Sequence, residues 1–107
     1  MKLWVDDIRP APNGYVWCRS VYDAIYEIEG NEMYHWVPEN INQDPITLID
    51  VDHDAGEFAK FGGDYIKLLD WLEETGRNYP IRIHSMNPVG RGNMRNIIRK
   101  NGWTEVE

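Results

Sequence analysis

The chain has 107 residues, and its 11 Lys and Arg against 18 Asp and Glu give a formal net charge of −7 at pH 7. This length predicts one domain. With 42% hydrophobic and 12% aromatic residues, the composition favours a compact core over a disordered chain. The acidic balance excludes a protein that coats extended nucleic acid, because such proteins need clustered Lys and Arg. It still allows a nucleotide or one strand end to bind at a local basic patch.

Targeting signals and cysteine usage indicate where the protein works. No apolar run is long enough to span a bilayer, and no basic start leads into an apolar stretch, so we expect neither a membrane span nor a signal peptide. The single cysteine, Cys18, excludes a disulfide framework, and we expect its thiol to be buried and inert. These features predict a cytoplasmic protein.

The pattern of apolar and turn residues predicts strands that alternate with helices. The predicted strands cover residues 2–6, 15–18, 46–51, 81–83 and 103–106. The predicted helices begin at the caps Ser20 and Asp64 and at Arg91, and they end at Gly30, Gly76 and Asn101. Strands separated by helices form a parallel sheet with right-handed crossovers. The sequence therefore predicts a single α/β domain over residues 1–107.

Two segments depart from this alternation. Only eight residues separate Asp6 from Tyr15, and the prolines and the Asn-Gly pair of residues 9–14 forbid a helix there. We therefore expect a proline-rich loop in place of the first helix, which would leave one face of the sheet less covered. Residues 31–45, which contain two prolines, are expected to form a surface insertion.

Ionisable and hydroxyl residues follow three of the predicted strands. They are Asp6 and Asp7, then Asp52, His53 and Asp54, and finally His84 and Ser85. In an open parallel sheet, ligands bind beyond the carboxyl ends of the strands. If the three strands are neighbours, their direction alone brings these side chains into one crevice.

The four aspartates Asp6, Asp7, Asp52 and Asp54 offer hard oxygen ligands, which suit Mg²⁺ or another divalent cation. A cation or partial protonation would relieve their mutual repulsion. A single Asp at a strand end more often caps a loop or pairs with a neighbour such as Arg9. Four at one predicted edge favour a functional site.

The two histidines His53 and His84 suit acid and base catalysis. A neutral imidazole takes a proton from water while a protonated one gives a proton to a leaving oxygen. This division of labour suits the opening of a cyclic phosphate. Each histidine alone is as well explained as an ordinary structural residue, and the sequence does not say which one would be the base.

The glycine-bearing turn before the last helix is a candidate phosphate site. Backbone N–H groups of such turns and of helix N-termini attract anions. Arg91 opens the helix, where the macrodipole disfavours a cation unless it meets an anion. Together with Asn87, Gly90, Ser85 and the loop residue Arg9, it forms the predicted phosphate-binding set. The alternative is an ordinary turn in which Ser85 is a cap and Arg9 pairs with aspartates.

Three stretches, residues 3–10, 52–56 and 83–90, resemble the cyclic-phosphate processing receiver domain, a variant of the receiver domains of response regulators. The resemblance runs from residue 1 to about residue 103 and is poor over 31–45 and 57–62. It implies a small flavodoxin-like parallel sheet of order 2-1-3-4-5. In contrast to ordinary receivers, we expect no fifth helix. The resemblance also implies Mg²⁺ held by the acids and a role on nucleotides or RNA ends that carry a cyclic phosphate. Ordinary receivers carry a lysine after the fifth strand, and residues 103–107 contain none, which disfavours a phosphorelay through Asp52.

The sequence thus predicts a phosphoesterase in which His53, His84 and Asp52 are catalytic. The alternative is a non-catalytic receiver-like module that docks a protein partner or senses a nucleotide. A third interpretation, an acidic mimic of nucleic acid, predicts dispersed acids instead of a cluster at the strand ends.

Overall fold

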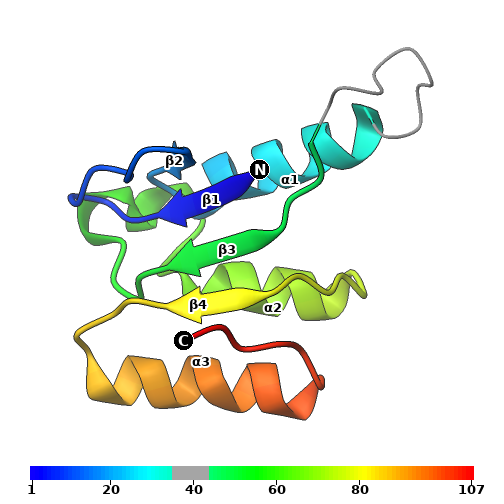
Figure 1. Cartoon of the computed structure of the whole chain (residues 1–107). Coiled ribbons are helices and arrows are strands. Elements are labelled where there is room, and N and C mark those ends of the chain that lie inside the picture. Colours follow the sequence, from blue (N-terminus) through cyan, green and yellow to red (C-terminus); the bar gives the residue numbers. More distant parts are fainter. Residues whose placement is uncertain (35–43) are drawn as a thin grey trace.

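The computed structural model describes residues 1–34 and 44–107 and contains one four-stranded parallel sheet. Its strands are β1 (Lys2–Val5), β2 (Tyr15–Cys18), β3 (Leu48–Val51) and β4 (Ile81–Ile83). They lie in the order β2-β1-β3-β4, as Figure 1 shows. The parallel direction and the order predicted for these four strands are therefore confirmed, and the fold is receiver-like.

Three α-helices and one 3₁₀ helix complete the domain. They are α1 (Val21–Tyr34), η2 (Gly56–Phe61), α2 (Ile66–Glu74) and α3 (Pro88–Lys100). Helices α1 and α2 lie behind the sheet in Figure 1, while α3 packs against α2 and β4. No helix in the described part of the chain is long and apolar enough to cross a membrane.

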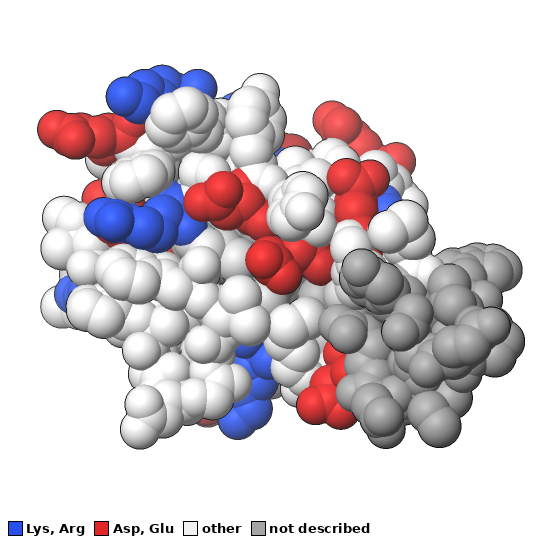
Figure 2. Space-filling model, turned by 90° about the horizontal axis from the view of Figure 1, so that it is seen from above, with Lys and Arg blue, Asp and Glu red and all other residues white. Residues whose placement is uncertain are grey.

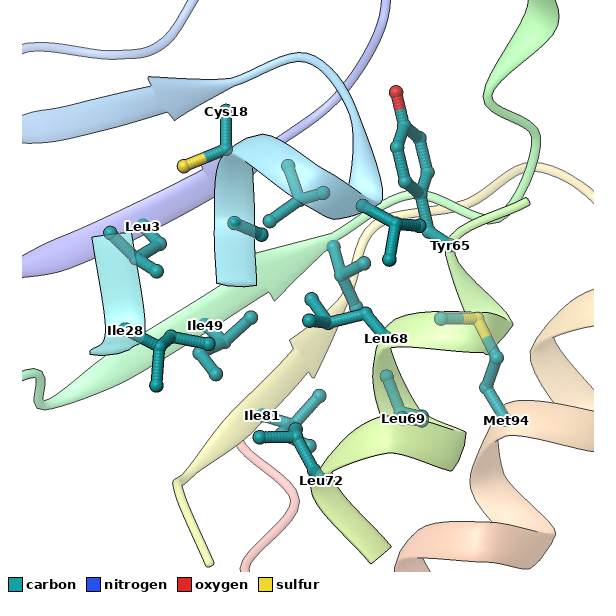
Figure 3. Close-up of a cluster of buried hydrophobic side chains, with 14 of the residues drawn as sticks. Leu3, Cys18, Ile28, Ile49, Tyr65, Leu68, Leu69, Leu72, Ile81 and Met94 are labelled. Carbon is teal, nitrogen blue, oxygen red and sulfur yellow. The ribbon is translucent and has the colours of Figure 1, made fainter. Parts of the chain in front are cut away.

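The hydrophobic core fills the space between the sheet and α1 and α2, as Figure 3 shows. Strand residues at alternate positions, such as Leu3 and Ile49, meet Ile28 of α1 and Leu68 and Leu72 of α2. Burial of each such side chain contributes about 1.5–3 kcal/mol before entropy is counted. The core therefore fixes which way each strand faces, and hence where the polar strand residues point.

The opposite face of the sheet carries polar and aromatic residues. In register across the four strands lie Trp17, Trp4, Asp50 and Arg82. Residues 6–14, between β1 and β2, form bends and a turn at the end of this face. The two indole N–H groups fasten that segment, since Trp4 donates to the carbonyl of Arg9 and Trp17 to that of Asp6.

The structure corrects several predicted boundaries. Helix α1 does not end at Gly30 but continues to Tyr34, because Gly30 lacks the positive φ of a helix-ending glycine. Asp64 does not cap α2, since its carboxylate instead accepts the N–H of Ala55. Residues 31–34 of the predicted insertion belong to α1, and residues 35–43 lie outside the described part.

The predicted fifth strand over residues 103–106 does not form. The segment makes one parallel bridge to β4, between Ile81 and Glu105, with backbone hydrogen bonds on either side of it. Strand β4 has only three residues, so the partner for a longer ladder is short. Cys18 is fully buried, and burial raises the pKa of its thiol to about 12, which leaves it unreactive.

Candidate functional site

The ring of His84 is held between two carboxylates and against an indole. Its Nδ1 lies 2.7 Å from Oδ1 of Asp50, and its Nε2 lies 2.9 Å from Oδ2 of Asp6. The ring also stacks on Trp4, with 3.9 Å between centroids and 3° between planes. Each ring nitrogen faces a carboxylate oxygen, an arrangement that favours hydrogen on both nitrogens and hence the charged imidazole.

The hydrogen bonds of His84 outweigh its burial. Burial disfavours the charged ring, but the hydrogen bonds to Asp50 and Asp6 and their negative charges raise the pKa of His84 above its ordinary value. Burial would likewise raise the pKa of Asp6, but hydrogen bonds from the N–H groups of Arg9 and Ile8 and from His84 lower it. Asp6 and His84 therefore form a charged pair at the end of β1 and β4.

A second acid stands near this pair. Ligand atoms of Asp6, Asp52 and His84 lie within 4.8 Å of one another. Asp52 follows β3, and its Oδ1 accepts the N–H of His53. Burial, together with the charges of Asp6 and Asp52, raises the pKa of Asp7, which shows that three carboxylates share this edge.

The carboxylates of this edge fit a hard divalent cation better than a soft one. Mg²⁺ binds through one or two carboxylates, and Asp6 and Asp52 provide them. The nitrogens of His84 already face Asp6 and Asp50, so its ring is the least suitable donor of the group. Asp54 is not in the group, since its exposed carboxylate points to Nδ1 of His53 at 2.8 Å.

His53 stands against the start of α3. A β-carbon added to Gly90 would lie 2.5 Å from its ring, so this glycine is what lets the ring approach the helix. The side chain of His53 is 15% exposed, and its Nδ1 faces Asp54. His53 and His84 therefore have different surroundings, an exposed carboxylate for one and two buried carboxylates for the other.

The turn between β4 and α3 is closed by its own side chains. The Oγ of Ser85 accepts the N–H of Asn87, and the side chain of Asn87 caps α3 by accepting the N–H of Gly90. Arg91 donates to the carbonyl of Ser85 at 3.3 Å and forms no ion pair among the described residues. Arg9 is exposed, and its backbone N–H donates a hydrogen bond to Oδ1 of Asp6.

A hollow of about 410 Å³ opens beside His84. Ser85 and Arg91 line it, together with Arg82 of β4 and Arg95 of α3. The predicted phosphate residues Ser85 and Arg91 thus border the same hollow as His84. Figure 2 views the molecule from above, with α3 on the far side, and there basic and acidic side chains both lie on the left, the side toward which the strands of Figure 1 point.

Sequence reasoning missed Asp50, Trp4 and Arg82 as parts of this site. Asp50 is fully buried in the middle of β3 and accepts hydrogen bonds from His84 and Arg82. Its signal was a carboxylate inside an otherwise apolar strand, which demands a buried partner. The contact of Trp4 with His84 is visible only in the structure.

A parallel sheet with acids gathered beyond its carboxyl edge is the arrangement of a receiver-like domain. A model of the cyclic-phosphate processing receiver domain matches residues 1–100, and the chain therefore belongs to that family. Neither the curated proteins nor the solved structures gave a match. Membership in this family is consistent with a role in cyclic-phosphate processing.

Proposed function

We propose that this protein opens a cyclic phosphate on a nucleotide or an RNA end by hydrolysis. The observation that carries the proposal is the His84 ring, held by Asp6 and Asp50 beside a hollow lined by Ser85 and Arg91. The family supports the substrate class. A buried, charged imidazole beside a hollow lined by Ser85 and Arg91 is an arrangement that suits proton transfer to a phosphate ester.

The reaction needs one proton acceptor and one proton donor. The oxygen of water forms a bond to phosphorus, and one of the two P–O bonds of the ring breaks. A base takes the proton that water loses, and the departing sugar oxygen receives a proton. The product is a phosphate monoester, so no oxidant or second substrate is required.

The two histidines divide these tasks according to their partners. His84 faces a carboxylate at each nitrogen, which favours the charged ring. It acts as the acid when the departing sugar oxygen takes the place of the Asp6 carboxylate at Nε2. His53 faces one carboxylate, that of Asp54, through Nδ1. With hydrogen on Nδ1, the Nε2 of His53 has a free lone pair and acts as the base.

Phosphate binding falls to the turn and the start of α3. The Oγ of Ser85 already accepts a hydrogen bond, so its own hydrogen is free to donate to a phosphate oxygen. Arg91 offers a guanidinium fork to the same group. Asn87 and Gly90 hold the turn in shape. Arg9 is exposed and does not line the hollow beside His84.

A divalent cation would be held by the carboxylates of Asp6 and Asp52. When bound, it would offset their negative charge and that of the phosphate. Asp6 also keeps the ring of His84 oriented through its contact with Nε2. Asp52 keeps the backbone of His53 in place through its hydrogen bond.

The test is hydrolysis of uridine 2′,3′-cyclic phosphate, followed by phosphorus NMR, which separates the cyclic diester from the monoester. We expect His84→Gln and His53→Gln each to lower kcat by about 10²–10⁴-fold. Arg99→Gln, an exposed change far along α3, serves as the control and keeps the wild-type rate. Unfolding midpoints show that each variant is folded.

Two results would contradict this proposal. Equal rates in wild type and His84→Gln would remove the ring from the chemistry. Tight binding of the cyclic phosphate with no monoester formed would instead favour a sensor that binds the nucleotide without turnover.

A further inference from the structure

The hollow beside His84 continues along α3. A second hollow of about 390 Å³ adjoins it and is lined by Pro88 and Gly92. The two share Ser85, Met86, Arg91 and Arg95 as lining residues. They therefore form one continuous groove, called here the α3 groove.

Arginines line both parts of the α3 groove. Arg91 and Arg95 border both hollows and stand one helical turn apart, about 6 Å along the axis. Arg82 borders only the hollow that contains His84 and is paired with Asp50. Three of the chain's 11 basic residues therefore meet at one groove, and the acids Glu105 and Glu107 line the part of it that contains His84. Arg91 is the arginine of the groove with no ion pair among the described residues, so it is the cation left to meet an anionic ligand.

The pairing of Arg95 differs from that of Arg91. Arg95 forms an ion pair with Glu105, with 2.8 Å between Nη2 and Oε2. The Nε of Arg95 lies 3.0 Å from each carboxylate oxygen of Glu105. Glu105 is itself fixed beside β4 by its bridge to Ile81. The carboxylate of Glu105 thus binds the guanidinium of Arg95 in the way that a phosphate group of a ligand would bind it.

We propose that the α3 groove binds a second phosphate of the substrate, at Arg95, one nucleotide unit from the phosphate that Ser85 and Arg91 hold. This inference rests on the proposed function for the position of the first phosphate. The spacing of Arg91 and Arg95 along the helix is one that neighbouring phosphates of a nucleotide can match. The substrate then carries a 5′-phosphate or a preceding nucleotide, and a nucleoside with a single phosphate fills only half of the groove.

Glu105 sets the strength of the second subsite. The incoming phosphate must share Arg95 with the Glu105 carboxylate, which repels it. Removing that carboxylate therefore strengthens binding of a second phosphate but leaves the first phosphate unaffected. If the Arg95–Glu105 pair were only structural, removing Glu105 would not improve ligand binding. An increase in affinity for the second phosphate therefore distinguishes a ligand subsite from a structural ion pair.

The experiment measures binding directly by calorimetry, with uridine 3′-phosphate, uridine 3′,5′-bisphosphate and a diuridylate that ends in a 3′-phosphate. We expect the bisphosphate and the diuridylate to bind about tenfold tighter than the monophosphate. Binding of the bisphosphate should also weaken more steeply with added salt than binding of the monophosphate, because a second charge contact is screened. Equal affinities of bisphosphate and diuridylate identify a 5′-phosphate as sufficient, and a tighter diuridylate shows that the preceding nucleoside adds contacts.

Three variants sharpen the test. Glu105→Gln should tighten bisphosphate binding by about two- to fivefold and leave monophosphate binding unchanged. Glu105→Gln combined with Arg95→Gln should abolish the preference for the bisphosphate without leaving either charge unpaired. Arg99→Gln, on the same helix but outside the groove, should keep the preference.

The inference is overturned if all three ligands bind equally with equal salt slopes, or if the double variant keeps the preference. Binding is independent of turnover. A preference for the bisphosphate without hydrolysis of cyclic phosphate would refute the proposed function alone. Hydrolysis without the preference would refute the second subsite alone.

Discussion

His84 and Asp50 are 34 positions apart in the chain, yet their side chains meet at 2.7 Å because β3 and β4 are neighbours. Asp50 is fully buried and also accepts a hydrogen bond from Arg82, its register partner on β4. The two cations that balance the charge of Asp50 are therefore Arg82, which lies in β4, and His84, which directly follows β4. A buried carboxylate without such partners would cost several kcal/mol, so the three residues depend on one another.

Removing the charge of Asp50 should destabilise the protein. We expect Asp50→Asn to lower the free energy of unfolding by about 3 kcal/mol, because it leaves the buried imidazolium of His84 with one carboxylate. Urea unfolding followed by tryptophan fluorescence measures the change. Asp54→Asn is the matched control, since that carboxylate is 63% exposed and pairs with His53 at the surface. A loss of stability that is equal in the two variants would refute the role given to Asp50.

The raised pKa of His84 predicts a specific pH dependence of stability. The unfolded ring has a pKa of about 6.5, and the folded ring holds its proton to a higher pH because of Asp50 and Asp6. Its contribution is therefore complete below pH 6.5 and is lost as the pH rises through the folded pKa. Between pH 6 and pH 9, wild type should lose more stability than His84→Gln. Parallel curves for the two proteins, measured with a chelator present, would show that the ring is not charged in the folded state.

A divalent cation should stabilise the protein through Asp6 and Asp52. At a Mg²⁺ concentration ten times its Kd, the free energy of unfolding should rise by about 1.4 kcal/mol, which shifts Tm by roughly 5 °C in a domain of this size. Asp52→Asn should abolish the shift and a chelator should reverse it in wild type. Asp54→Asn, which changes an acid outside the group, should keep it. A shift that survives in Asp52→Asn would mean that the ion binds elsewhere.

Strand direction explains why the site could be predicted in outline. Asp6, Asp52 and His84 come together because the ends of parallel neighbouring strands meet, and that follows from the order of strands and helices alone. The partners of His84 did not follow, because which carboxylate a ring meets depends on side-chain direction across the sheet. Asp50 was hidden by its apolar neighbours in β3, which made the whole strand look like core.

The limits of helices and strands were harder to predict than their existence. Gly30 looked like a helix end, yet the helix continues to Tyr34. A glycine ends a helix only when the chain needs a positive φ there, and tertiary packing decides that. The tail after Trp103 had the composition of a strand but meets β4 through a single bridge. Composition gives the preference for a strand, and the available partner decides its length.

The contact between Gly90 and His53 gives a prediction with an internal control. A β-carbon at Gly90 would lie 2.5 Å from the His53 ring, so Gly90→Ala must push the ring or the helix away. We expect a loss of about 1–3 kcal/mol in the free energy of unfolding. If His53 is the base, kcat for the cyclic phosphate should also fall at least tenfold.

Gly92 is two residues further along the same helix, and a β-carbon there would meet nothing within 4 Å. Gly92→Ala should therefore stabilise the protein by up to about 1 kcal/mol, the difference in helix propensity. It should not lower kcat for uridine 2′,3′-cyclic phosphate, whose single phosphate does not occupy the second hollow that Gly92 lines. Urea unfolding and the phosphorus NMR assay, applied to both variants, separate the two effects. If Gly90→Ala behaved like Gly92→Ala in both measurements, the position of His53 against α3 would have no part in stability or chemistry.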